Sequence, residues 1–133
     1  MTLGARAVVH DPAQGVLLIR HTYTPGWQFP GGGVERGEAI GEALERELRE
    51  EACIALRAEP VLHGLFFNRA ASDRDHVAVY RVDDFAVIGE KRPDWEIAEA
   101  RFFSLDDLPD GVSEGTLRRL REIFAGEPVS PDW

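Results

Sequence analysis

The sequence predicts an α+β fold in which a mixed β-sheet is sandwiched between helices, an α/β/α arrangement. Its expected elements run in the order strands, loop, helix, strands, loop, strand, helix, which is not the regular strand–helix alternation of a doubly wound parallel sheet. The chain has 133 residues, enough to bury a core without disulfides or metals. No repeat, low-complexity tract or linker interrupts it, so we expect residues 1–133 to form one domain.

The first half of the chain predicts two strands, a loop and a helix. Residues 5–10 and 15–21 are rich in β-branched residues and are separated by the turn-forming sequence DPAQG, so we expect two strands with a tight connection. The sequence TYTPGWQFPGGG then predicts a loop, because prolines and glycines punctuate it. Residues 38–52 follow with apolar side chains on every fourth position, the spacing of a helix.

The second half predicts three more strands and a final helix. Residues 54–68 predict a strand interrupted by a proline, residues 76–85 a second, and residues 101–108 a third. The polar sequences RAASDRD and GEKRPDWEIAEA predict loops between them. In the last helix, within SEGTLRRLREIFAG, Ser113 is the expected N-cap and Gly126 lies just past the end.

The composition excludes several classes of partner and environment. A net charge of −9 argues against general affinity for nucleic acid or for an anionic membrane, and a substrate bearing phosphates would need metal ions between it and the protein. A single cysteine, Cys53, permits no internal disulfide and suits a reducing compartment. With neither a signal peptide nor an apolar run near the roughly 20 residues of a membrane helix, we expect a cytoplasmic monomer or homodimer.

The helix at residues 38–52 divides its glutamates between two faces. At 100° per residue, Leu44 and Leu48 define the buried stripe, Glu51 falls inside it, and Glu47 and Glu50 lie toward its edge. The glutamates on the solvent face are Glu42 and Glu45. Like charges at these spacings repel, and a desolvated carboxylate is costly without a cation. Because Mg²⁺ takes oxygen ligands, the pattern favours a metal site over the alternative, a structural ion-pair network.

The glycine-rich segment before this helix is a second candidate part of a site. Three consecutive glycines, Gly31, Gly32 and Gly33, allow main-chain groups to approach a ligand closely, just ahead of a helix N-terminus. Trp27 and Phe29 flank them, and each either stacks on a bound base or packs beneath the loop.

The stretch from Gly32 to Ile54 resembles the signature box of the Nudix hydrolases. That box reads Gly, five residues, Glu, seven residues, Arg-Glu, an aliphatic, one residue, Glu-Glu, one residue, Gly and an aliphatic. The matching positions here are Gly32, Glu38, Arg46, Glu47, Leu48, Glu50, Glu51 and Ile54. Cys53 replaces the last glycine, which ends the helix with positive φ, so we expect a cost of about 1 kcal/mol there. With the similar flanks GWQFPGGGVERGE and EIAEARFFSLDDLP, the resemblance spans residues 5–125.

The resemblance implies a fold and an activity. The Nudix fold is an α/β/α sandwich around a mixed, partly curled sheet. Its members use Mg²⁺ or Mn²⁺ to hydrolyse a nucleoside diphosphate linked to another group X, so a small nucleotide-type substrate is expected. Water attacks one phosphorus of the pyrophosphate and a glutamate accepts its proton. The alternative is a Nudix-fold protein that binds or senses a nucleotide without cleaving it, although such members usually lose box glutamates and this chain keeps them all.

The resemblance also implies roles for residues. The expected metal ligands are Glu47, Glu50, Glu51, Glu96 and the main-chain carbonyl of Gly31. Arg46 would orient the carboxylates and pair with Glu38. The proton acceptor is a box glutamate in some members and a glutamate from a later loop in others.

Outside the box, several residues keep more than one interpretation. Glu96, in DWEIAEARFF, stands where the loop acid is expected, with Glu99 as the alternative and a plain surface role for Glu96 left open. Arg20 is a candidate phosphate contact, although lone surface arginines are common. The histidines near predicted strand ends are His21, His63 and His76. No cysteine or carboxylate stands beside them at zinc-ligand spacing, so zinc is not expected.

Overall fold

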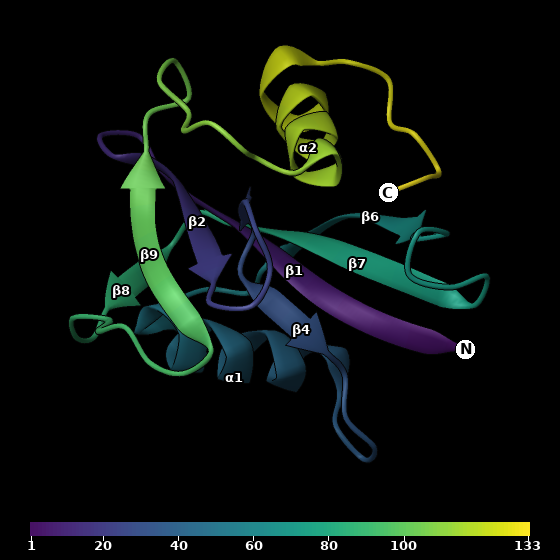
Figure 1. The fold of residues 1–133 in the computed structure, drawn as a ribbon, viewed down its shortest axis with the longest axis horizontal. Helices are drawn as coiled ribbons and strands as arrows, with labels where there is room; N and C mark the ends of the chain where they lie inside the picture. The colour runs from purple at the N-terminus through teal and green to yellow at the C-terminus, as the bar shows by residue number, and fades with distance from the viewer.

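Two helices lie on opposite faces of a mixed β-sheet in the computed structural model, which describes residues 1–133 (Figure 1). The helices are α1 (Ile40–Ala52) and α2 (Glu114–Ala125). The strands are β1 (Thr2–Asp11), β2 (Gly15–His21), β3 (Trp27–Gln28), β4 (Gly31–Gly33), β5 (Ile54–Leu56), β6 (Val61–Phe67), β7 (Asp75–Val82), β8 (Phe85–Val87) and β9 (Ile97–Phe103). The predicted α+β class and its layering are confirmed. Neither helix combines the length and the apolar composition that crossing a membrane requires.

The large sheet is mixed and curled because β1 shares one edge between two partners. Its central order is β3-β2-β1-β7-β6, with β4 added to β1 and β9 to β2. Only the β1–β7 pairing is parallel. On its other edge, β1 pairs with β4 along Gly4–Arg6 and with β2 only at His10 and Asp11. Beyond the hairpin β2 therefore leaves β1, and β4 takes its place on the same edge of β1 (Figure 1).

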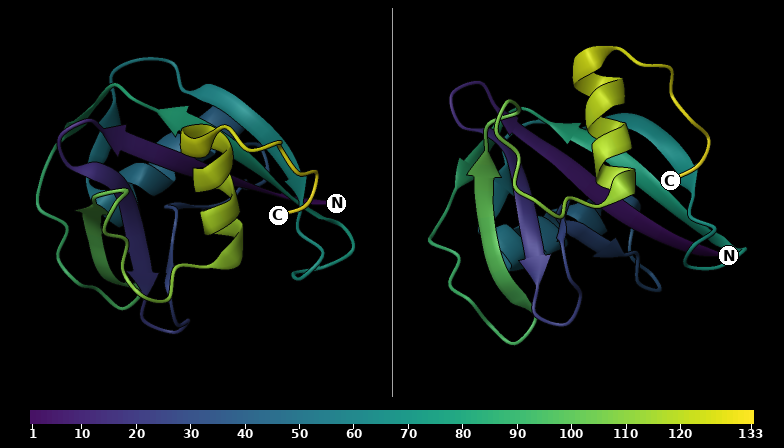
Figure 2. Two further views of the ribbon diagram at one scale, coloured as in Figure 1. Left: turned by 90° about the horizontal axis from the view of Figure 1, so that it is seen from above. Right: turned by 45° about the horizontal axis from the view of Figure 1, so that its top comes forward.

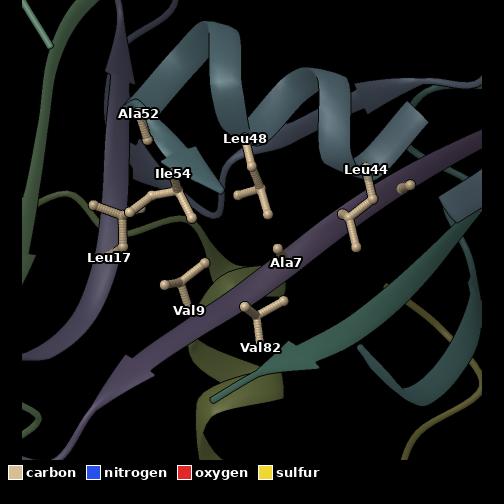
Figure 3. Packing of buried hydrophobic residues seen from close by; sticks show 9 residues of the cluster. Ala7, Val9, Leu17, Leu44, Leu48, Ala52, Ile54 and Val82 are labelled. Atoms are coloured by element: carbon tan, nitrogen blue, oxygen red, sulfur yellow. The ribbon is translucent and has the colours of Figure 1, made fainter. Parts of the chain in front are cut away.

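Each face of the sheet has its own apolar core. On the α1 side, Leu44 and Leu48 of the predicted stripe pack against Leu17 of β2 and Val9 of β1 (Figure 3). On the other face, α2 lies across β1 and β7 (Figure 2), and its Leu120 belongs to the second cluster. Since both faces are covered, the central strands read as nearly continuous apolar runs.

Two predicted loop segments form strands. Gly31, Gly32 and Gly33, which were expected in a loop, form the strand β4. Gly31 has a φ of +143°, and a side chain on Gly31 would collide with the Ala5 carbonyl of β1. The last strand, expected at residues 101–108, instead spans Ile97–Phe103. Both predictions were wrong for the same reason: a distant strand supplies the hydrogen-bonding partner, and local composition does not reveal it.

A buried charge network secures the C-terminal segment, far from the box helix. Arg119 is fully buried, its Nε lies 2.9 Å from a carboxylate oxygen of Glu122, and its guanidinium lies 3.8 Å from the centre of the Phe66 ring. His63 contacts Glu122 at 2.8 Å. Burial alone would raise the pKa of Glu122, but the hydrogen bonds it accepts lower it. These charges are paired with one another, so this cluster is structural.

The helices end where the sequence predicts, and α1 ends at Cys53, the residue that departs from the box. Cys53 ends α1 with φ 54° and ψ 41°, the left-handed conformation expected for the glycine it replaces. We expect Cys53→Gly to raise the free energy of unfolding by about 0.5–1 kcal/mol and to leave kcat within a few-fold. Chemical denaturation measures this directly. A clear loss of stability would instead show that packing of the thiol outweighs the backbone strain.

Candidate active site

Arg46 organises the acidic side chains around the middle of α1. Its Nε and Nη2 donate to the Glu38 carboxylate at 2.8 and 3.0 Å, and its Nη1 donates to Glu47 at 3.0 Å. The hydrogen bonds from Arg46 hold the pKa of Glu38 at about 2. The pairing of Arg46 with Glu38 implied by the resemblance is therefore present, and the planar guanidinium fixes Glu47 beside it.

Glu47 lies against the glycine strand. A Cβ atom on Gly32 would stand 2.5 Å from its Oε1, a distance that real contacts do not reach. Burial raises the pKa of Glu47, and Arg46 partly offsets that effect. The absence of a side chain at Gly32 therefore lets a half-buried carboxylate approach the main chain of β4.

This contact predicts the effect of one added methyl group. Gly32→Ala should displace the Glu47 carboxylate and lower kcat by at least ~10-fold, because a misplacement of ~1 Å at a reacting centre can cost ~10²-fold. Glu47 is the far end of a flexible side chain, so the melting temperature should change little. Gly41→Ala is the matched control, since nothing lies within 4 Å of a Cβ there. Unchanged kinetics in Gly32→Ala would show that the position of Glu47 is not critical.

Glu51 is the most deeply buried carboxylate of the helix. Its side chain belongs to a residue only 3% exposed, as its place in the apolar stripe predicts, and its Oε1 accepts the Gly31 N–H at 2.7 Å. Burial raises the pKa of Glu51 to about 8, and the hydrogen bond from Gly31 opposes this only in part. A negative charge here is therefore poorly compensated by the protein, which is the environment that a bound cation would relieve.

The same hydrogen bond places the main chain of Gly31 beside Glu51. The N–H of Gly31 donates to Glu51 and not to β1, although Gly31 is paired with Arg6 in the ladder. The main chain of β4 therefore lies next to the most buried carboxylate, at the position where the resemblance implies that a carbonyl is a further ligand.

The loop before β9 brings Glu96 to this edge. Asp94 Oδ1 accepts the N–H groups of Glu96 at 2.9 Å and Ile97 at 2.6 Å. The Thr22 N–H donates to the Glu96 carbonyl at 2.9 Å, and Thr22 Oγ1 donates to the Trp95 carbonyl at 2.6 Å. These bonds hold the loop against the end of β2, so Glu96 is fixed rather than free on the surface.

One histidine joins these carboxylates. Ligand atoms of His21, Glu51 and Glu96 lie within 4.8 Å of one another. Burial, together with the nearby Arg6, lowers the pKa of His21, which keeps the ring neutral near pH 7. Arg6 donates to the Phe29 carbonyl at 2.8 Å, and its positive charge acts on both Glu51 and His21. The donor set, carboxylate oxygens with an imidazole, fits a divalent cation.

The sequence analysis named His21 only as a histidine near a strand end and gave it no role in the site, and it missed Arg6. The strand period could have indicated His21, because residues two apart along a strand share a face. Leu17 and His21 of β2 are four residues apart, and Leu17 packs on α1. Their face therefore points toward the helix that carries Glu51.

Other predicted residues occupy less central positions. The expected placement of Glu50 near the core is wrong, since its side chain is 61% exposed and lies 3.6 Å from Arg46. Phe29 is 0% exposed, which rules out stacking on a substrate and supports the alternative of packing beneath the loop. Trp27 is also buried, edge-on to Phe103 at 4.8 Å between ring centres.

Arg20 and Glu99 form a pair on the other face of β2. Their side chains lie 3.3 Å apart, and Glu99 also contacts Arg101 at 3.4 Å. Arg20 lies over the ring of Trp27, and Trp27 belongs to the core on the face of the sheet opposite α1. Glu99 is therefore engaged with two arginines, whereas Glu96 faces the carboxylates of the helix, and this difference favours Glu96 as the loop acid.

An open cleft adjoins the cluster. It has a volume of about 470 Å³ and is lined by Arg20, His21, Thr22, Tyr23, Thr24, Pro25 and Gly26. Tyr23 is largely exposed, and its ring lies 5.1 Å from that of His21. The cleft thus offers an aromatic surface and an arginine next to His21.

The sequence and the fold both match known proteins. The NUDIX domain family matches residues 1–123. An ADP-ribose pyrophosphatase of Methanocaldococcus jannaschii is 33% identical over 99 residues, covering 71% of this chain and 57% of that protein. A diphosphoinositol polyphosphate phosphohydrolase 2 of Rattus norvegicus is 36% identical over 93 residues, covering 64% of this chain and 51% of that protein. The chain thus spans about half the length of these relatives.

Solved structures share the whole fold. The crystal structure of a MutT NUDIX hydrolase from Burkholderia pseudomallei superposes with a TM-score of 0.76 at 29% identity, covering 92% of this chain and 97% of that one. A NUDIX hydrolase from Nitrosomonas europaea gives a TM-score of 0.76 at 20% identity, covering 94% and 89% of the two chains, which shows the fold alone.

Proposed function

The chain belongs to the NUDIX family, and from this premise we propose that it is a metal-dependent pyrophosphohydrolase of a small nucleotide-type substrate. The substrate would be a nucleoside diphosphate linked to another group, and cleavage would yield a nucleoside monophosphate and the phosphorylated group. The observation that carries the proposal is the buried Glu51 carboxylate with Glu96 and His21 beside it, where the nearby Arg6 does not offset the cost of burying the Glu51 charge.

Different residues would bind the metal ion, accept the proton and position the carboxylates. Glu47, Glu50, Glu51, Glu96 and the Gly31 carbonyl would hold Mg²⁺ or Mn²⁺. The ion would neutralise phosphate oxygens and acidify the attacking water. Glu96 would accept a proton from the attacking water, and Arg46 keeps Glu47 in place through its bidentate contact with Glu38. Because the chain carries a net charge of −9, binding of a polyphosphate otherwise has little electrostatic support.

Substrate recognition is assigned to the cleft along residues 20–26. Tyr23 offers the exposed aromatic face that Phe29 lacks, and it is our candidate for stacking on a base. Arg20 reaches phosphate oxygens only by exchanging its contact with Glu99. Main-chain groups of Gly32 and Gly33 in β4 would contact the phosphates, whereas Trp27 is buried in the core and would act only by supporting the neighbouring loop.

A substrate panel tests the proposal. ADP-ribose, a diphosphoinositol polyphosphate, an oxidised nucleoside triphosphate, sugar nucleotides and dinucleoside polyphosphates would each be incubated with the protein and Mg²⁺ or Mn²⁺. ADP-ribose and the diphosphoinositol polyphosphate are included because the names of two relatives mention them. Chromatography should detect cleavage of the pyrophosphate in at least one. Calorimetric binding without cleavage across the panel would favour the nucleotide-sensing alternative, and neither binding nor cleavage would overturn the proposal.

A further inference from the structure

We propose that His21 binds the divalent cation through a ring nitrogen, so that the centre has a mixed nitrogen and oxygen donor set and prefers Mn²⁺ to Mg²⁺. This inference rests on the metal site of the proposed function and adds a ligand from β2, outside the box. It assigns the last residue of that strand a direct role at the ion.

The first observation is geometric. One ring nitrogen of His21 and one carboxylate oxygen each of Glu51 and Glu96 all lie within 4.8 Å of one another. Ligand atoms on opposite sides of one ion, at ~2.1 Å each, are ~4.2 Å apart. A side-chain adjustment of less than ~1 Å therefore brings all three atoms onto one ion.

The second observation concerns the ring itself. His21 is only 9% exposed, and its buried Nδ1 has no hydrogen-bond partner. A buried polar atom without a partner costs free energy, so it normally finds one. The main-chain carbonyl of Glu96 faces the ring, but it already accepts the Thr22 N–H at 2.9 Å, and Nδ1 is left without a hydrogen-bond partner. An ion between His21 and the carboxylates would give the imidazole a stronger partner than this shared carbonyl.

The surroundings hold His21 in this position. It ends β2, opposite a bulge in β9: Arg20 pairs with Glu99 and His21 with Ile97, so Ala98 is the extra residue, two positions from Glu96. Bulges commonly re-aim side chains beside sites. The next residue, Thr22, is the one that clamps the Glu96 loop, so two of the three ligands are fixed relative to each other by adjacent main-chain contacts.

The nitrogen ligand has a chemical consequence. Mg²⁺ favours oxygen ligands and retains its waters, whereas imidazole suits first-row transition metals. Loss of His21 should therefore weaken Mn²⁺ binding by about 10-fold or more, since loss of a group that supports a metal site typically lowers the affinity about 10- to 100-fold. Mg²⁺ binding should weaken by less than about threefold.

Pulsed electron paramagnetic resonance of the Mn²⁺-loaded protein tests the assignment without measuring activity. The wild-type protein with one equivalent of Mn²⁺ should show nitrogen modulation, and labelling histidine with ¹⁵N should change its pattern. His21→Ala should abolish the modulation. His76→Ala is the matched control, because His76 also has a buried, unpartnered Nδ1 but belongs to no carboxylate cluster, and it should retain the signal.

The outcomes separate this inference from the proposed function. Absence of nitrogen modulation in the bound wild-type protein, or its persistence in folded His21→Ala, would overturn the role of His21 even if Mg²⁺ supported hydrolysis. Histidine-dependent modulation without cleavage of any panel compound would support the ligand and overturn the hydrolase. If His21→Ala fails to fold, the same spectrum of His21→Gln, which keeps most of the side-chain volume, decides the point. Failure of the wild-type protein to bind Mn²⁺ would overturn the role of His21, whereas the proposed function is tested separately by hydrolysis with Mg²⁺.

Discussion

Glutamine in place of Glu47, Glu50 or Glu51 is expected to lower kcat by at least ~10²-fold, as for loss of a group that stabilises charge in a transition state. The substitution keeps the size of the side chain and removes only its charge. In Glu51→Gln the amide oxygen can still accept the Gly31 N–H, so the contact at 2.7 Å survives. Steady-state kinetics with the best panel substrate would measure the loss.

The solvent face of the same helix provides the control. Glu42 and Glu45 are exposed, and glutamine at either position should change kcat less than about twofold, since exposed charges contribute little. These variants match the others in charge change and helix propensity. If both sets lost activity alike, net charge rather than a metal site would explain the effect.

Stability separates a functional role of Glu51 from a structural one. The cost of burying its carboxylate outweighs the attraction of Arg6, as its raised pKa shows, so a neutral side chain of the same shape removes a net cost. In a metal-free buffer we therefore expect Glu51→Gln to melt at or above the temperature of the wild-type protein. A large fall in melting temperature together with the loss of activity would indicate that Glu51 mainly supports the fold.

Chelation of divalent cations should abolish hydrolysis completely. An acidic site on a protein of net charge −9 repels a polyphosphate unless cations lie between them. Activity in excess EDTA should fall to background and return when Mg²⁺ or Mn²⁺ is added in excess of the chelator. The two apolar cores make no use of a metal, so circular dichroism should remain unchanged in EDTA. Full turnover in EDTA would exclude the metal mechanism.

Much of this arrangement follows from local sequence. Helical period places Leu44, Leu48 and Glu51 on the buried side of α1, and the structure confirms all three. The end of the helix at Cys53 also follows, because the chain must take a left-handed conformation at that position. These features depend on residues a few positions apart, so their pattern is visible in the sequence.

Features set by distant pairing were not predictable in the same way. The strand β4 exists because Gly31–Gly33 pair with β1, and the start of β9 is set by β2. The meeting of His21 with Glu96 depends on that second pairing and on the clamp at Thr22. Phe29 was ambiguous for a related reason, since only the three-dimensional core shows which side of the loop it occupies.

The central claim is that the buried carboxylates of α1 form a cation site, and calorimetric titration with Mn²⁺ tests it most directly. Wild-type protein and Glu45→Gln should bind with the same affinity, because Glu45 faces solvent. Glu51→Gln should bind at least ~10-fold more weakly, since it lacks a charged ligand. Equal affinity in all three proteins would contradict the account, because it would place the ion somewhere other than at Glu51.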